Sequence, residues 1–300
     1  MPQPETLGRN GSYAAFRKLH QDVAAFRRYL SQAATSPEDE ELLAAKMMGR
    51  WRSGAPLALS PQHDDPALGA DPGRRNTFLY AREDPAGFVT PAGCHIRRAN
   101  PRDASVAGEV RLHRMIRRGA VYGSPLPDGD LENDGVDRGL MFAFIGAHLG
   151  RQFEFVQSQW MNDSVFFGAG DAKDPVAGSH DGSGGFTVPR RPVRRRLPPL
   201  PRFVVTRGGE YCFLPGLRAL RWLGDLRDHR AAGTPHHHGR HRRRTQRPAR
   251  PGRDRHRLLR PARHPRRTRR GLLSGLAAAL PIAAVLNSRR NRPPTTRRAR

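Results

Sequence analysis

The N-terminal part of the chain changes from a strand-like to a helical pattern of apolar and polar positions. Residues 12–19 fit a strand, and residues 22–33 then place Val23, Phe26 and Leu30 on one side of a helix, because residues three or four apart share a helix face. The pattern therefore predicts a strand followed by an amphipathic helix.

A second helix start follows at Ser36-Pro37. Serine caps free N–H groups at a helix N-terminus, proline suits the first helical position, and the acidic run at 38–41 favours the positive end of the helix dipole. We expect this helix to continue through 42–48. The next segment, 54–77, is rich in Pro, Gly and Asp, and we interpret it as a long surface loop.

Further along the chain, apolar positions predict a buried strand at 139–147 and a helix at 149–160, with Phe153, Val156 and Trp160 along one side. Residues 203–206 and 210–214 flank Arg207-Gly208-Gly209, which we interpret as a hairpin turn, and residues 215–223 begin a terminal helix. Strand–helix units joined to antiparallel hairpins indicate the α+β class and a ferredoxin-like fold, an antiparallel sheet with packed helices.

The stretch CHIRRANPRD, residues 94–103, sets one histidine among arginines and an Asn-Pro turn, and a second basic pair, Arg117-Arg118, precedes Gly119. A haem site needs an imidazole to hold the iron and fixed cations to neutralise the propionates and a developing peroxide anion. A lone histidine in a basic loop is more often a solvated or hydrogen-bonded residue. Chemistry alone leaves both interpretations open.

Longer blocks around this motif resemble consecutive segments of the dye-decolourising peroxidases, in which HIRRxNPR and a following RRGxxYG lie on the two sides of haem b. The matching blocks are 7–26, 78–103, 113–123, 139–160 and 186–220, within a span of roughly 7–223. The resemblance implies a dimeric α/β-barrel type of ferredoxin-like fold, built from two such modules. It also implies the cofactor haem b (iron protoporphyrin IX) and a peroxidase that uses hydrogen peroxide to oxidise bulky phenolic or dye-like aromatic substrates.

The resemblance assigns roles to individual residues. His95 is the expected axial ligand of the iron, and Arg117 is the expected distal arginine, with Arg118 as its less favoured neighbour. Asn100, Pro101 and Arg102 match the turn that lines the haem, and either Arg102 or Arg97 is available to pair with a propionate.

Aromatic and sulfur side chains leave alternatives. Phe142 and Phe144 alternate on the predicted strand and supply either an apolar wall for the haem or ordinary core.

Cys94 and Cys212 form neither CxxC nor CxxCH, which argues against a zinc cluster and covalent haem attachment. A Cys94 thiolate ligand is the alternative to His95. Adjacent residues of an extended chain point to opposite sides, so only one of the two can face the iron, and the family comparison favours His95.

The family's GxxDG motif, whose aspartate is the distal acid–base group, lies upstream of the region matched here. The letters recur at 178–182, but there they follow the histidine within a Gly/Ser/Asp loop, so we interpret Asp181 as a loop residue. Without the true aspartate, proton transfer would rely on Arg117 and water. General acid–base help is worth a factor of about 10²–10⁴, so a catalytically impaired haem-binding remnant is an alternative function.

The formal charge of +26 is concentrated at the C-terminus: between Asp225 and Arg300 there are 23 Arg, three Asp and no Lys, which places +20 of it there. We therefore divide the chain into an incomplete Dyp-type haem-binding region, 1–224, and an Arg/Pro/His-rich low-complexity tail, 225–300, interpreted as disordered or frame-shifted. A reading-frame shift within a GC-rich coding sequence yields such an amino-acid composition. Nonspecific nucleic-acid binding through the tail is the alternative.

The remaining signals concern location and association. The N-terminus lacks a basic n-region, an apolar h-region and twin arginines, so a cytoplasmic location is expected. The apolar stretch 271–288 is short and broken by Pro281, so no membrane partner is expected. An incomplete fold leaves one sheet face uncovered, which favours a homo-oligomer.

Overall fold

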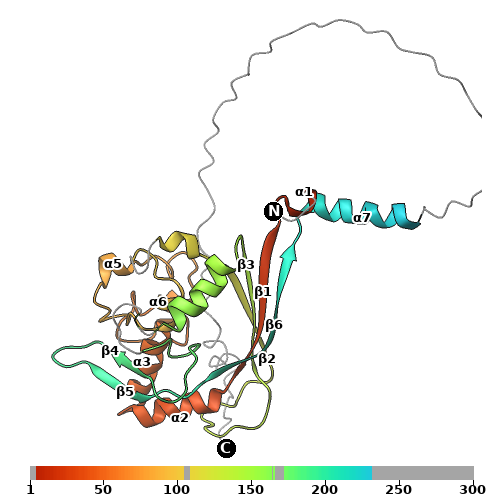
Figure 1. Cartoon of the computed structure of the whole chain (residues 1–300). Coiled ribbons are helices and arrows are strands. Elements are labelled where there is room, and N and C mark those ends of the chain that lie inside the picture. The colour runs from red at the N-terminus through yellow and green to blue at the C-terminus, as the bar shows by residue number, and fades with distance from the viewer. Residues whose placement is uncertain (1–4, 105–108, 164, 166–171, 232–300) are drawn as a thin grey trace, which may run out of the picture.

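A computed structural model describes residues 5–104, 109–163, 165 and 172–231. Its centre is a four-stranded antiparallel sheet in the order β2-β3-β1-β6. The strands are β1 (Ser12–Gln21), β2 (Ile116–Tyr122), β3 (Gly139–Gly146) and β6 (Val204–Leu214). With helices after β1 and after β3, the chain follows the β-α-β-β-α-β order of a ferredoxin-like module (Figure 1). The α+β, ferredoxin-like prediction is confirmed, and within the described residues this sheet is open rather than closed into a barrel.

The first two long helices begin where their capping residues predict. In α2 (Val23–Ala33), the side chain of Asp22 accepts a hydrogen bond from Ala25 N at 2.9 Å. In α3 (Pro37–Met48), Ser36 accepts from Asp39 N at 3.2 Å. The helix ends at Gly49, whose φ of 90° suits glycine. These helices pack with strands β4 (Gly185–Val188) and β5 (Arg195–Pro199) around the largest apolar cluster, which includes Phe26, Leu30, Leu43, Met47, Phe186 and Phe203.

The predicted hairpin at 207–209 is wrong. Residues 204–214 form the single strand β6, which pairs along its whole length with β1. The register shifts opposite Lys18/Leu19 and leaves Arg207 out of the pairing. Gly209 is needed for close approach rather than for a turn, because a Cβ there would lie 2.2 Å from the carbonyl oxygen of Phe16.

The segment 54–77 is also more structured than predicted. It contains the short helix α4 (Pro66–Ala70), and it buries Ala55, Leu57 and Leu68 against Trp51 in an apolar cluster of their own. Its Pro, Gly and Asp residues provide turns and caps, as at Asp65, which accepts from Leu68 N, but the apolar residues between them anchor the segment to the body.

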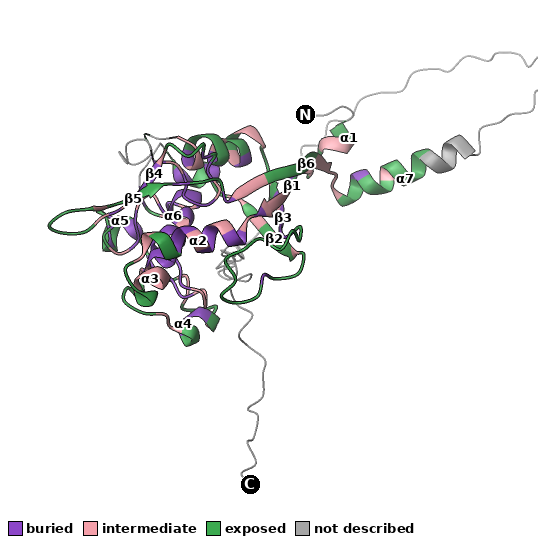
Figure 2. Ribbon diagram, turned by 90° about the horizontal axis from the view of Figure 1, so that it is seen from below, coloured by how far each residue is buried: buried purple, intermediate pink, exposed green. Residues whose placement is uncertain are grey.

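The sheet has two different faces (Figure 2). On one face Phe142 and Phe144 are buried and pack on Phe153 of the following helical segment. That segment lies where a helix was predicted, and it is π-helical, as η2 (Gly150–Glu154) and η3 (Val156–Met161). The other face exposes apolar side chains, so the prediction of a buried strand at 139–147 holds for one face only. The exposed residues are Phe16, Ile116, Met141 and Ile145, each at least 41% exposed.

The C-terminal helix α7 (Leu217–Ala231) starts two residues later than predicted and runs away from the body beside the short α1 (Glu5–Gly8) (Figure 1). It continues seven residues into the segment assigned to the tail. Most of the tail, including the apolar stretch 271–288, lies outside the described residues. Within the described part of the chain, no helix has the length and apolar character needed to span a bilayer.

Candidate functional site

His95 is the first residue of the five-residue helix α6 (His95–Ala99) and is 1% exposed. Its Nδ1 lies 2.9 Å and 3.1 Å from the two carboxylate oxygens of Asp174. Nε2 is buried and has no hydrogen-bond partner among the described residues. An imidazole with one nitrogen held by a carboxylate and the other left free is the arrangement seen in metal-ligating histidines.

Asp174 is the functional residue that sequence reasoning missed. It is fully buried, and its Oδ1 also accepts from the N–H groups of Val176 at 2.9 Å and Ala177 at 2.8 Å. Burial alone would raise the pKa of this carboxyl, but His95 and the two backbone N–H groups lower the pKa below its usual value. The sequence signals a turn at Asp174-Pro175, and nothing in it links that turn to a histidine 79 residues earlier.

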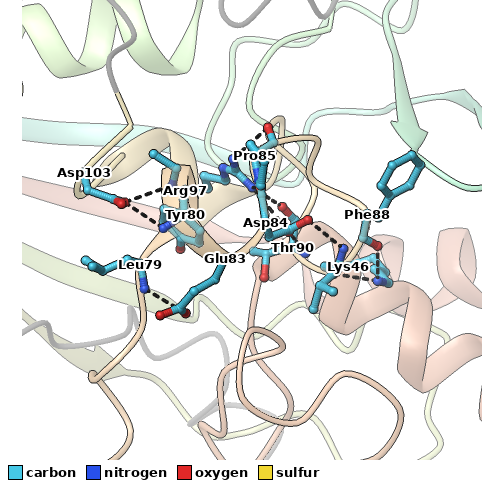
Figure 3. A network of polar contacts seen from close by, with 12 residues as sticks. Lys46, Leu79, Tyr80, Glu83, Asp84, Pro85, Phe88, Thr90, Arg97 and Asp103 are labelled. Atoms are coloured by element: carbon cyan, nitrogen blue, oxygen red, sulfur yellow. Dashed lines mark hydrogen bonds and ion pairs between the residues drawn. The ribbon is translucent and has the colours of Figure 1, made fainter.

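Arg97 clamps one side of α6 to the loop that precedes it. Its Nη1 donates to the carbonyl oxygens of Asp84 at 2.9 Å and Thr90 at 2.8 Å, and its guanidinium lies over the ring of Tyr80. Asp84 closes the same loop, because its carboxylate accepts from the N–H of Val89 and of Thr90 (Figure 3). The guanidinium of Arg97, one of the two candidates for a haem propionate, thus donates to carbonyl oxygens of the protein.

The far side of this loop is held by Lys46 of α3, whose Nζ donates to the carbonyl oxygens of Phe88 and Val89 (Figure 3). Burial lowers the pKa of this ammonium group. The loop from 84 to 90 is therefore fixed between α3 and α6, immediately before the residues that lead to His95.

Arg98 clamps the other side of α6. It is fully buried and donates to the carbonyl oxygens of Trp160, at 2.9 Å, and Ala172. These acceptors lie at the end of η3 and just before Asp174. Because Arg98 and His95 both bind this part of the chain, α6 and the carboxylate of Asp174 are held in a fixed position relative to each other.

The turn after α6 faces a different part of the molecule. Asn100 caps the helix, Pro101 is buried, and Arg102 has a φ of 59°. The guanidinium of Arg102 donates to the carbonyl oxygens of Asn76 and Phe78 and lies 3.8 Å from the centre of the Phe78 ring. The turn is thereby joined to the segment before α5 (Tyr80–Glu83).

Arg117 lies on β2 and faces the same side of the sheet as its register partner Phe144. Its Nη1 donates to the carbonyl oxygen of Ala99 at 3.3 Å, and its Nε is buried without a partner among the described residues. Burial, with the nearby charge of Arg102, lowers the pKa of this guanidinium. Arg118 is exposed, and as the next residue of the strand it lies on the other face of the sheet.

The two remaining candidates, Cys94 and Asp181, have surroundings that do not suit the roles considered for them. Cys94 packs in the apolar cluster under α3, and burial raises the pKa of its thiol to about 12, so it stays protonated at neutral pH and is a poor thiolate ligand. Asp181 is exposed, and its carboxylate accepts from the N–H and hydroxyl of Ser183.

These residues fit a haem. Iron in such a cofactor takes an imidazole nitrogen as axial ligand, and Nε2 of His95 supplies a buried one that no described residue occupies. The fold and the site together define an α+β protein of ferredoxin-like topology with a buried histidine that is supported by a carboxylate.

The comparisons with known proteins agree with that class. No family model matches the chain. A dye-decolorizing peroxidase from Exidia glandulosa is 36% identical over 228 residues, which cover 70% of this chain and 44% of that protein. A fungal DyP-type peroxidase structure from Auricularia auricula-judae has a TM-score of 0.62 at 32% identity, covering 72% of this chain and 53% of that one. A dye-decolorizing peroxidase in complex with 2,6-dimethoxyphenol has a TM-score of 0.60 at 35% identity, covering 70% and 51%.

The chain is thus similar to one part of the dye-decolorizing peroxidases. It spans about half the length of the relatives and structures that it matches.

Proposed function

We propose that this chain is the haem-binding part of a peroxidase that reduces hydrogen peroxide and oxidises aromatic substrates. The observation that carries the proposal is the state of His95, which is buried, held at Nδ1 by Asp174 and free at Nε2. The family relationship supports haem b as the cofactor.

In this proposal His95 would hold the haem iron through Nε2, and Asp174 sets the tautomer of its imidazole. A carboxylate next to Nδ1 keeps the ring proton on that nitrogen, so Nε2 presents its lone pair. The same carboxylate raises the basicity of the imidazole. When bound, haem supplies the redox chemistry of peroxide reduction.

Arg117 supplies the fixed cation of the site. It is carried by the sheet rather than by α6, and its Nη1 donates to the carbonyl oxygen of Ala99 at the end of that helix. Reduction of peroxide places negative charge on the departing oxygen, and a preorganised guanidinium stabilises that charge. Asn100, Pro101 and Arg102 shape the turn behind the ligand, and Phe142 and Phe144 form apolar surface next to Arg117.

The reducing substrates in this proposal are bulky phenols and dyes. The support is the family name of the relatives and the solved complex of one structural neighbour with 2,6-dimethoxyphenol. That phenol is therefore the first substrate to test.

The decisive experiment is reconstitution of the purified chain with haem, followed by its absorption spectrum. A Soret band displaced from that of free haem, with one haem per chain, is the expected result. Addition of peroxide and 2,6-dimethoxyphenol then measures turnover. A displaced band without turnover would identify a haem-binding remnant, and no displaced band would refute the proposal.

A second candidate function rests on charge. The segment 225–300 carries 23 Arg and three Asp, a density that binds polyanions through counterion release and does so without sequence preference. Nonspecific nucleic-acid binding through this segment is independent of the haem site and is tested separately by salt-dependent DNA binding.

A further inference from the structure

His180 is a buried histidine next to Asp174 to which neither the family motifs nor the proposed peroxide chemistry assigns a part. It is 3% exposed, and its Nε2 lies 2.7 Å from the main-chain carbonyl oxygen of Asp174. Its Nδ1 is buried without a partner among the described residues. Because a carbonyl oxygen only accepts, Nε2 carries the proton, and the ring is the neutral Nε2–H tautomer.

The hydrogen bond from His180 closes a tight turn around Asp174. The same carbonyl oxygen accepts from Gly178 N at 3.0 Å, while the carboxylate of Asp174 accepts from the N–H groups of Val176 and Ala177. The approach requires glycine at 178, because a Cβ there would lie 2.4 Å from the Asp174 carbonyl oxygen. The backbone and side chain of Asp174 are thus both fixed by the turn that His180 closes.

The backbone around His180 is itself tethered from outside. Arg202 donates from Nε to the carbonyl oxygen of His180 at 3.1 Å and from Nη2 to the hydroxyl of Ser179 at 2.9 Å. Lys173 donates to the carbonyl oxygen of Ser179 at 2.9 Å. The main chain that carries the imidazole is therefore held from two sides, by Arg202 and by Lys173.

We propose that His180 is a positioning residue that holds the Asp174 carboxylate against Nδ1 of His95 and so sets the donor strength of that imidazole. The inference rests on the proposed function, since it gives His95 its ligand role. A carboxylate that is correctly aligned makes the imidazole a stronger donor, and outer groups of this kind are worth about 10–100-fold in metal affinity. Loss of the His180 hydrogen bond lets Asp174 move and weakens the donor.

The test compares two amides of different reach. In His180→Gln the amide nitrogen can occupy the place of Nε2 and still donate to Asp174, whereas the shorter side chain of His180→Asn cannot. His180→Leu removes the donor altogether, and Asp181→Asn is the matched control at the next, exposed position. The readouts are the iron–histidine stretching frequency of the haem-loaded ferrous protein by resonance Raman and the Fe(III)/Fe(II) potential.

We expect His180→Asn and His180→Leu to lower the stretching frequency and raise the potential in the same direction as Asp174→Asn. His180→Gln and Asp181→Asn should stay near the wild type. Wild-type frequency and potential in His180→Asn would overturn the inference, and so would an equal change in His180→Gln and His180→Asn, which would indicate a role in packing alone.

A second measurement needs no haem. In the apoprotein labelled with ¹⁵N-histidine, the His95 Nδ1–H proton held by Asp174 should resonate far downfield, move upfield in His180→Asn, and be retained in His180→Gln. An unchanged signal in His180→Asn would overturn the inference. If the wild type takes up no haem, the proposed function fails, while this measurement still decides the role of His180.

Discussion

Arg117 on strand β2 donates a hydrogen bond to the carbonyl oxygen of Ala99, the last residue of the helix that begins with His95. The contact joins the sheet to α6 and brings together the two residues to which the family resemblance assigns the distal cation and the axial ligand. They are 22 positions apart in the sequence and belong to two different elements, β2 and α6.

Replacing Arg117 by Leu should leave haem bound and slow its reaction with peroxide. Removal of one preorganised donor costs roughly 10²–10³ in rate. Stopped-flow absorbance after peroxide addition measures this rate. Arg118→Leu is the matched control, because Arg118 is exposed on the other face, and a larger loss in that variant would exchange the two roles.

Replacing His95 by Ala should abolish stoichiometric haem retention. Among the described residues, His95 alone has one ring nitrogen held by a carboxylate and the other buried without a partner. Haem content per chain after desalting is the measurement. His148→Ala, at an exposed position, should retain haem like the wild type. Full haem content in His95→Ala would show that another residue is the ligand.

Replacing Asp174 by Asn should raise the Fe(III)/Fe(II) potential and weaken haem binding about 10–100-fold. The amide keeps an acceptor for Val176 and Ala177 but cannot accept from Nδ1 of His95 with the strength of a carboxylate. Spectroelectrochemical titration and haem titration report the two effects. Unchanged values would mean that the 2.9 Å contact has no influence on the ligand.

Stability should fall as the pH drops below 6.5, in part through His180. Burial lowers the pKa of this imidazole from 6.5, with Lys173 adding to the effect and Asp174 and Asp181 opposing it. The unfolded chain then binds a proton that the folded chain excludes, so the contribution is complete above pH 6.5 and is lost toward the lower folded pKa, by at most about 1.4 kcal/mol per pH unit. Urea unfolding of the wild type and of His180→Gln between pH 7 and pH 5 should show a shallower pH dependence in the variant. Parallel curves would contradict this assignment.

Removal of residues 232–300 should leave haem binding intact and abolish most affinity for DNA. This deletion retains α7, whereas a cut at 225 would shorten it. Fluorescence anisotropy with a DNA duplex at two salt concentrations measures the binding, which weakens steeply with salt when phosphate contacts dominate. Loss of haem in the shortened chain would show that the C-terminal segment packs on the body.

The parts of the fold that local chemistry determines could be predicted from the sequence. The caps at Asp22 and Ser36 and the end at Gly49 fix α2 and α3 through groups within a few residues of each other. The hairpin failed because Arg207-Gly208-Gly209 has turn chemistry, yet β1 offers one continuous edge to the residues on both sides of it. Pairing with a strand about 190 residues away overrides a local turn preference.

The candidate site divides in the same way. His95 and Arg117 were found through motifs, whereas Asp174 and His180 act through contacts that depend on how distant loops meet. Arg97 and Arg102 were the candidates to pair with a haem propionate, but both donate to carbonyl oxygens of the protein. A sequence shows that a guanidinium is present, and only the packing shows which acceptors surround it.

The shortness of α6 has a consequence for how the protein reaches its native state. A five-residue helix has too few internal hydrogen bonds to persist alone, so its geometry depends on the contacts from Arg98 to Trp160, 62 residues away, and from His95 to Asp174, 79 residues away. Contacts of such separation form late, because closing long loops costs entropy before the contacts repay it. Haem capture during refolding should therefore lag behind the collapse of α2 and α3, and the appearance of a Soret band would time the last stage of folding.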